Sequence, residues 1–180
     1  MTIPNLISLF RLFLVPMIVW ALVDEHYSYA LLGFFIAGVS DLLDGFLARK
    51  MQCQTTLGRY LDPIADKVLL VAVFITLGLH GFFPSWLVIL VVFRDFVILG
   101  GALLAVVFQS SLEIKPLFIS KANTLMQLLV VVIVLAELAY GTIYPTLNDI
   151  LFILTAITTL LSGGSYVKKW LENSSKDVIT

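Results

Sequence analysis

Four aspartates fall within one short stretch of an otherwise apolar chain. The stretch is "DLLDGFLARKMQCQTTLGRYLDPIADK", residues 41–67, and its aspartates are Asp41, Asp44, Asp62 and Asp66. The first two are spaced i,i+3 and the last two i,i+4, so on helices each pair shares one face. Two antiparallel neighbouring helices would bring all four carboxylates around one point. At a membrane boundary such carboxylates would repel each other unless cations neutralised them.

The donor type indicates which cations these would be. Carboxylate oxygens without nearby His or Cys suit Mg²⁺ or Mn²⁺. Two such ions would balance four carboxylates, and paired divalent ions recur in phosphoryl chemistry. We therefore expect two divalent metal ions, Mg²⁺ or Mn²⁺, held by Asp41, Asp44, Asp62 and Asp66.

The rest of the stretch suits a metal-bound diphosphate. Gly45 and Gly58 lack side chains and let a ligand approach the backbone. Thr55 can cap the following helix, whose first amides favour phosphate. The guanidinium of Arg49 offers several N–H donors in a fixed arrangement, which suits a diphosphate or the edge of a nucleobase. The alternative is a solvated acidic surface with Asp and Arg paired, but two face-matched pairs beside two glycines favour a functional site.

The chain that positions this stretch has the composition of a membrane protein. Of its 180 residues 60% are apolar and 13% charged, against roughly 25% charged in soluble domains, and the mean hydropathy is +1.04. Apolar runs of about 20 residues, enough to cross a bilayer, recur at 6–23, 29–49, 58–79, 84–108, 119–140 and 147–169. The sequence predicts an all-α polytopic membrane protein with six transmembrane helices. A single domain is expected over residues 1–171, followed by a polar tail at 172–180.

Charge predicts the orientation of these helices. With six spans, both termini and the loops after the second and fourth helices share one side, and the lysines cluster there. The opposite loops, around residues 24–26, 80–84 and 140–149, contain no Lys or Arg. By the positive-inside rule both termini and the aspartates are cytoplasmic. The opening segment from Asn5 to Arg11 is mixed enough in polarity to lie partly in the membrane interface.

The aspartate stretch resembles the signature of the CDP-alcohol phosphatidyltransferases. Every defined position is present, as Asp41-x2-Asp44-Gly45-x2-Ala48-Arg49-x8-Gly58-x3-Asp62-x3-Asp66. The resemblance extends to the chain length and to the opening Pro4-Asn5-Leu6.

The resemblance implies an enzyme that displaces CMP from CDP-diacylglycerol with an alcohol. It implies a homodimer, with Asp41 and Asp62 bridging two metal ions, Asp44 completing one and Asp66 the other. Asp66 would also be the general base. The CDP-lipid would be held by Asn5, Gly45, Ala48, Arg49, Thr55 and Gly58. A bacterial inner (cytoplasmic) membrane location with the site facing the cytoplasm follows, and a nucleic-acid partner is not expected.

Chemistry adds one expectation for Asp66. Deprotonating an alcohol needs a carboxylate within hydrogen-bond reach. A carboxylate with both oxygens on metal would be a weak base, so we expect Asp66 to bind metal through one oxygen only.

The acceptor alcohol must be recognised outside the signature. Arg94-Asp95 lies within an apolar run, where a charge is costly unless it is paired or faces a polar cavity. An ion pair is one interpretation, but adjacent helix residues do not face each other, so we expect Arg94 to bind an acceptor phosphate. Lys115, Lys121 and Asn123 are the other candidate acceptor-binding residues.

The segment "KPLFISKANTLMQ", with "FRD" before it, is similar to the cardiolipin synthases of this superfamily, which use phosphatidylglycerol. Phosphatidylglycerophosphate synthases, which use glycerol 3-phosphate, resemble the chain in "IPNLISLFRL" and "LDPIADK". A dianionic phosphate is bound best by several cations, whereas a phosphodiester lipid carries one negative charge and needs fewer. Cardiolipin synthase is therefore the favoured function and phosphatidylglycerophosphate synthase the alternative.

A divalent-cation transporter is the non-enzymatic alternative, because acidic rings select cations. It would need carboxylates throughout the membrane depth, and the outer halves of these helices contain few.

Overall fold

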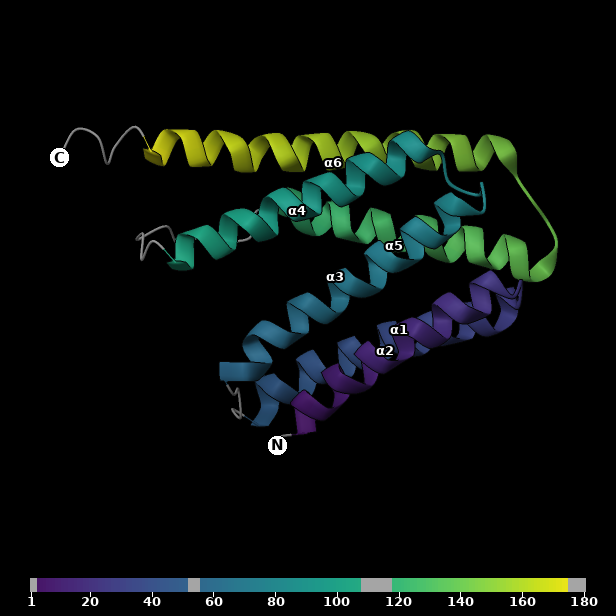
Figure 1. Ribbon diagram of the computed structural model, residues 1–180, viewed down its shortest axis with the longest axis horizontal. Helices are drawn as coiled ribbons and strands as arrows, with labels where there is room; N and C mark the ends of the chain where they lie inside the picture. Colours follow the sequence, from purple (N-terminus) through teal and green to yellow (C-terminus); the bar gives the residue numbers. More distant parts are fainter. Residues whose placement is uncertain (1–2, 52–55, 108–117, 175–180) are drawn as a thin grey trace. The chain divides into compact units, whose positions relative to one another are not determined.

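The computed structural model describes residues 3–51, 56–107 and 118–174, with side chains for residues 7–41, 65–101 and 118–166. Within these ranges the chain forms six helices and no strand, which confirms the all-α prediction (Figure 1). They are α1 (Ile3–Val23), α2 (Tyr27–Met51), α3 (Thr56–Leu79), α4 (Ser85–Val107), α5 (Phe118–Tyr140) and α6 (Pro145–Ser174). Each corresponds to one predicted apolar run. Helix α6 continues to Ser174 because the residues after 169 include good helix formers such as Leu and Glu.

The helices form two compact units. The first contains α1, α2, α3 and the segment Val131–Tyr144, and the second contains α4, the first half of α5 and α6. In the first unit α1 packs against both α2 and α3, and in the second α4 packs against α6. The first unit thus joins, through α1, the two helices that carry the aspartates.

Close packing of α1 against α2 occurs at a glycine. A Cβ atom at Gly33 would lie 2.9 Å from Cγ1 of Ile18, closer than real Cβ contacts allow. Ile18 and Leu22 of α1, Phe34 of α2, and Phe74 of α3 are buried. This apolar core holds the three helices together and so fixes the α1 side chains that lie between α2 and α3.

Three helices of the first unit end in the same way. At each end an amide donates to the carbonyl five residues earlier, and the residue before that amide has positive φ, the arrangement of a Schellman motif. The bonds are His26 to Ala21 at 2.7 Å, Phe82 to Leu77 at 2.9 Å and Thr142 to Glu137 at 3.0 Å, with Glu25, Gly81 and Gly141 at φ 60°, 79° and 70°. These tight ends make the connections short, so α2 returns directly beside α1.

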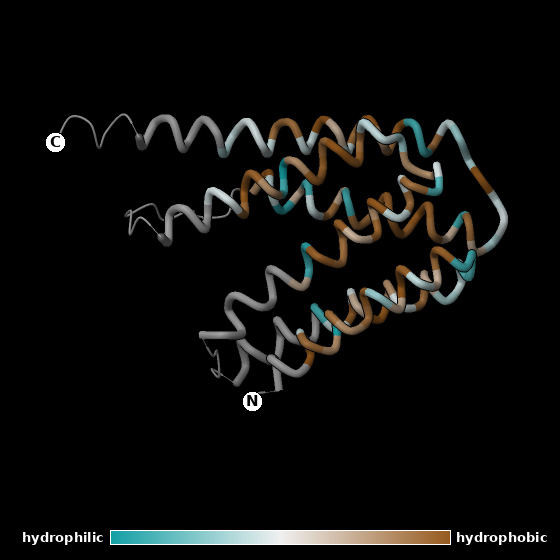
Figure 2. Tube along the Cα trace, viewed as in Figure 1, coloured by the Kyte–Doolittle hydropathy of each residue, from teal (hydrophilic) through white to brown (hydrophobic). Residues whose placement is uncertain are grey.

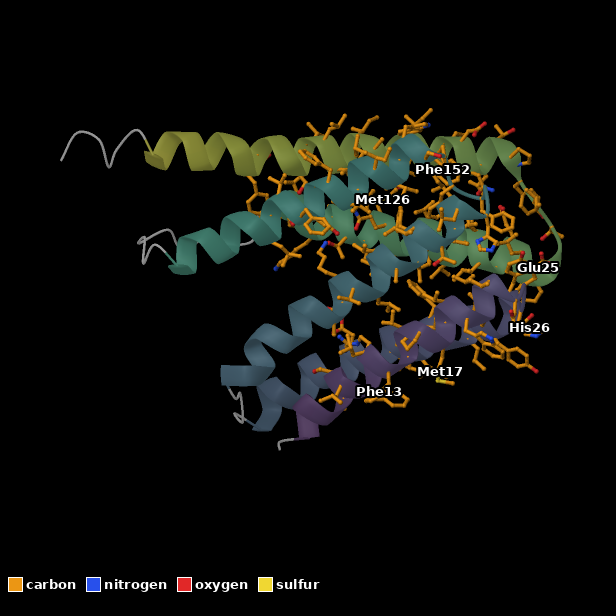
Figure 3. The ribbon with its side chains drawn as sticks, in the orientation of Figure 1. Phe13, Met17, Glu25, His26, Met126 and Phe152 are labelled. Atoms are coloured by element: carbon orange, nitrogen blue, oxygen red, sulfur yellow. The ribbon has the colours of Figure 1, made fainter. Side chains whose placement is uncertain are left out.

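The surface carries many large apolar side chains. Phe13 and Met17 project from α1 and are 67% and 63% exposed (Figure 3), and hydrophobic residues prevail along the described helices (Figure 2). Among the described residues, Phe118–Tyr140 and Pro145–Tyr166 are long and apolar enough to cross a bilayer, and Ile7–Val23 is a shorter apolar helix. Exposed apolar surface on this scale indicates membrane association. Six spans and the orientation of the termini stay predictions.

Candidate active site

Arg11 of α1 lies between Asp41 and Asp66, the two signature aspartates whose side chains are described. Its Nη2 is 3.0 Å from Oδ1 of Asp41 on α2. Its Nη1 donates to Oδ1 of Asp66 on α3. One guanidinium therefore contacts carboxylates from two other helices, while the predicted convergence of all four aspartates stays a prediction because the side chains of Asp44 and Asp62 are not described.

Burial differs sharply across this cluster. The Arg11 side chain is 0% exposed, whereas those of Asp41 and Asp66 are 45% and 39% exposed. The guanidinium is thus on the interior side of the carboxylates, each of which keeps an accessible surface. Burial of Arg11 is tolerable because a buried charge needs partners, and here it has two.

The other signature residues occupy the same helices. Asp44, Gly45, Ala48 and Arg49 follow Asp41 on α2, Gly58 and Asp62 precede Asp66 on α3, and Asn5 precedes Arg11 on α1. Their side chains lie outside the described part of the chain, as do Thr55 and Lys115 altogether. Their predicted roles in binding metal, CDP-lipid and acceptor stay predictions.

A second polar cluster surrounds Arg94 in the unit formed by α4, α6 and the first half of α5. Nη1 of Arg94 is 2.6 Å from Oδ1 of Asp95. Nη2 donates to Ser120 Oγ on α5 at 2.7 Å and also to Ser162 Oγ on α6. Arg94 and Asp95 are 4% and 1% exposed. Three helices of this unit therefore meet at one buried ion pair.

The Arg94–Asp95 pair differs from what helix geometry suggests. Adjacent residues point in different directions, yet the long Arg side chain bends back far enough to reach the neighbouring carboxylate. A Cβ atom at Gly163 would lie 3.6 Å from Cγ of Arg94, so α6 passes close beside the bend. The ion-pair interpretation is thus present in the structure, together with contacts to two hydroxyl groups.

Asn123 also binds across helices. Its Oδ1 accepts from Thr158 Oγ1 at 2.9 Å and from Thr159 Oγ1 at 2.8 Å, both on α6. Asn123 is fully buried, and its Nδ2 has no hydrogen-bond partner among the described residues. Lys121, in contrast, is exposed. Of the predicted acceptor-binding residues, Arg94 and Asn123 therefore share the buried α4–α5–α6 unit and Lys121 is at its surface.

Comparison with known proteins identifies the family. Residues 1–161 match the model of a family described as CDP-alcohol phosphatidyltransferase. The chain belongs to this family. The matched range includes Asp41 and Asp66, the carboxylates that Arg11 contacts.

The curated relatives of this family member include proteins with two kinds of name. It is 39% identical to the rice protein named CDP-diacylglycerol–glycerol-3-phosphate 3-phosphatidyltransferase 1, chloroplastic, over 94% of this chain and 57% of the relative. It is 36% and 34% identical to the rat and human cardiolipin synthases (CMP-forming), in each case over 92% of this chain and 60% of the relative. The chain thus spans about three fifths of the length of these relatives. The transporter alternative does not fit this family.

The described carboxylates suit the metal ions that the family implies. The described residues include no group of three or more His, Cys, Asp or Glu that could hold a metal ion. Asp44 and Asp62 are outside that search because their side chains are not described. Asp41 and Asp66 meet at one cation and are part-exposed, and carboxylate oxygen is the donor that Mg²⁺ and Mn²⁺ prefer. The donor chemistry therefore fits a divalent ion.

Sequence reasoning missed three polar residues that the structure brings into these clusters. Arg11 was considered only as part of a segment that lies partly in the membrane interface, and its fully buried contacts with Asp41 and Asp66 were not predicted. Ser120 and Ser162 bind Arg94. The available signal was the cost of a charge inside an apolar helix, which applies to Arg11 as well as to Arg94 and implies a nearby anion.

Proposed function

We propose that this chain transfers a phosphatidyl group from CDP-diacylglycerol to an alcohol and releases CMP. The observation that carries the proposal is the meeting of Asp41 and Asp66 from two helices, at the spacing of the family signature. Both carboxylates are part-exposed, so a substrate could reach them. The exposed apolar surface of the helices would let diacylglycerol tails approach from the bilayer.

In this proposal the residues have distinct roles. Asp66 takes the proton of the acceptor hydroxyl. The hydroxyl oxygen forms a bond to the lipid-bearing phosphorus while the bond from that phosphorus to the CMP oxygen breaks, and CMP leaves as an anion. Arg49, Gly45, Ala48, Thr55, Gly58 and Asn5 hold the CDP-lipid in place. Two ions, Mg²⁺ or Mn²⁺, held by Asp41, Asp44, Asp62 and Asp66, would stabilise the negative charge that develops on CMP.

Phosphatidylglycerol is the proposed acceptor, which makes the chain a cardiolipin synthase. Arg94 is a buried cation of the second unit, and the carboxylate of Asp95, 2.6 Å away, offsets its charge. Little positive charge is left for a dianion, whereas a phosphodiester carries a single charge. Arg94, Lys121, Asn123 and Lys115 would bind this acceptor. The second candidate is phosphatidylglycerophosphate synthase with glycerol 3-phosphate, which the rice relative's name favours.

An assay of CMP release separates the two acceptors. Purified protein in detergent, with Mg²⁺ or Mn²⁺ and CDP-diacylglycerol, should release CMP with phosphatidylglycerol and not with glycerol 3-phosphate. Release with glycerol 3-phosphate alone would establish the second candidate and leave the roles of the aspartates intact. Omission of the divalent ion should stop release with either acceptor, and release in its absence would contradict the metal proposal.

We further propose six transmembrane helices in a bacterial inner membrane, both termini cytoplasmic, and a homodimer. Cys53 is the single cysteine, so Cys53→Ala gives a background for labelling. On intact cells a membrane-impermeant maleimide should label Glu25→Cys, whereas Lys176→Cys should need permeabilised cells. The reverse pattern would invert the topology. Light scattering of the detergent-solubilised chain measures the dimer, and a monomer mass would contradict it.

A further inference from the structure

Arg11 has a contact pattern that the family signature does not include. It lies on α1, outside residues 41–66, yet its two Nη atoms contact Oδ1 of Asp41 and Oδ1 of Asp66. Its side chain has no exposed surface. Protein atoms therefore cover this guanidinium, which faces the two carboxylates.

We propose that Arg11 is a positioning residue that orients the carboxylates of Asp41 and Asp66 toward their exposed side. This inference rests on the proposed function. A carboxylate has about four acceptor positions on its two oxygens. Arg11 contacts Oδ1 of each aspartate from the buried side, so that the 45% and 39% exposed carboxylates present their outer side toward a divalent ion and the acceptor hydroxyl.

Geometry explains why an arginine suits this role. The guanidinium is planar and presents its donors in a fixed fork, so two Nη atoms can hold two carboxylates at a set separation. The two aspartates come from different helices, α2 and α3, and α1 packs against both. Arg11 therefore couples the packing of α1 to the direction of each carboxylate. A lysine would supply the same charge at a single point and could not hold both oxygens in this geometry.

Two substitutions test the role, with a control on the same helix. Arg11→Lys keeps the charge and loses the fork, and Arg11→Gln loses the charge. Phe13→Leu is the control, because Phe13 is 67% exposed and points away from the helix (Figure 3). With CDP-diacylglycerol and the active acceptor, each Arg11 variant should lose about 10- to 100-fold in kcat, in line with a small misplacement of reacting groups. The KM for CDP-diacylglycerol should stay near the wild-type value, and Phe13→Leu should change neither constant.

A binding measurement separates positioning from loss of the metal site. Electron paramagnetic resonance of Mn²⁺, without any lipid substrate, should show that Arg11→Lys still binds the ion with nearly wild-type affinity, because its charge and all four aspartates remain. A wild-type kcat in Arg11→Lys would overturn the proposal. So would a loss of Mn²⁺ binding that accounts for the whole loss of activity.

The wild-type protein supplies a test that does not depend on a variant folding. An experimental structure with Mn²⁺ and CMP should retain both Arg11 contacts, and movement of the guanidinium away from either carboxylate would overturn the inference. The wild-type assay comes first in either case. Absence of CMP release with every acceptor would reject the proposed function, while the contacts in the Mn²⁺ structure would still decide whether Arg11 holds both carboxylates.

Discussion

Asp66→Asn should lower kcat for CMP release by about 10²- to 10⁴-fold, the usual contribution of a general base. The amide cannot accept the proton of the acceptor hydroxyl at neutral pH. Its Oδ1 can still accept from Arg11 Nη1, so the contact between α1 and α3 is retained in the variant. The measurement is a time course of CMP release with phosphatidylglycerol, carried out beside wild-type protein at saturating Mg²⁺.

Binding and folding should be much less affected than turnover. CDP-diacylglycerol should bind Asp66→Asn, and the thermal unfolding temperature should stay close to that of wild type. Asp24→Asn, in the exposed turn between α1 and α2, is the matched control because it makes the same chemical change away from the cluster. Full activity in Asp66→Asn would reject the general-base assignment while leaving the family membership intact.

The helices and the meeting of Asp41 and Asp66 could be predicted because both depend on local spacing. An apolar run of about 20 residues favours a helix whatever surrounds it. Spacings of three and four residues place side chains on one face. If the two helices are antiparallel neighbours, these faces lie together, and in the structure Asp41 and Asp66 contact one guanidinium.

Arg11 could not be assigned in this way because its partners are remote in sequence. It is separated from Asp66 by 55 residues. Its role depends on α1 packing against α2 and α3 at once, which no spacing within α1 encodes. The polarity of the segment predicts only that it lies partly in the membrane interface, and it does not predict the contacts of Arg11 with two carboxylates.

The Arg94–Asp95 contact was not expected, because the rule that adjacent residues on a helix point apart was applied to whole side chains. The rule that adjacent helix residues diverge holds for Cβ directions. The arginine side chain is long enough to curve back along the helix, so that its guanidinium reaches the carboxylate of the next residue. Hydrogen bonds to Ser120 and Ser162 stabilise this conformation. These hydroxyls belong to α5 and α6, so the conformation follows from the assembly of three helices.

Replacement of Arg94 in this buried ion pair should have a large effect on stability. Arg94→Met should lower the free energy of unfolding by about 3–5 kcal/mol, because it leaves the carboxylate of Asp95 buried without its cation. Asp95 is 1% exposed, so water cannot replace the lost partner. Unfolding in detergent, followed by denaturant or heat, measures the change against wild type.

The double variant Arg94→Met, Asp95→Asn separates the structural role of Arg94 from its proposed binding role. Removal of both charges should recover most of the lost stability, because no unpaired buried charge remains. The KM for phosphatidylglycerol should stay raised in the double variant, since the proposed phosphate-binding cation is still absent. If that KM returned to the wild-type value together with the stability, Arg94 would be a structural residue and acceptor recognition would have to depend on other groups. If the double variant were as unstable as Arg94→Met, the hydrogen bonds to Ser120 and Ser162 would contribute more to stability than the charge pair.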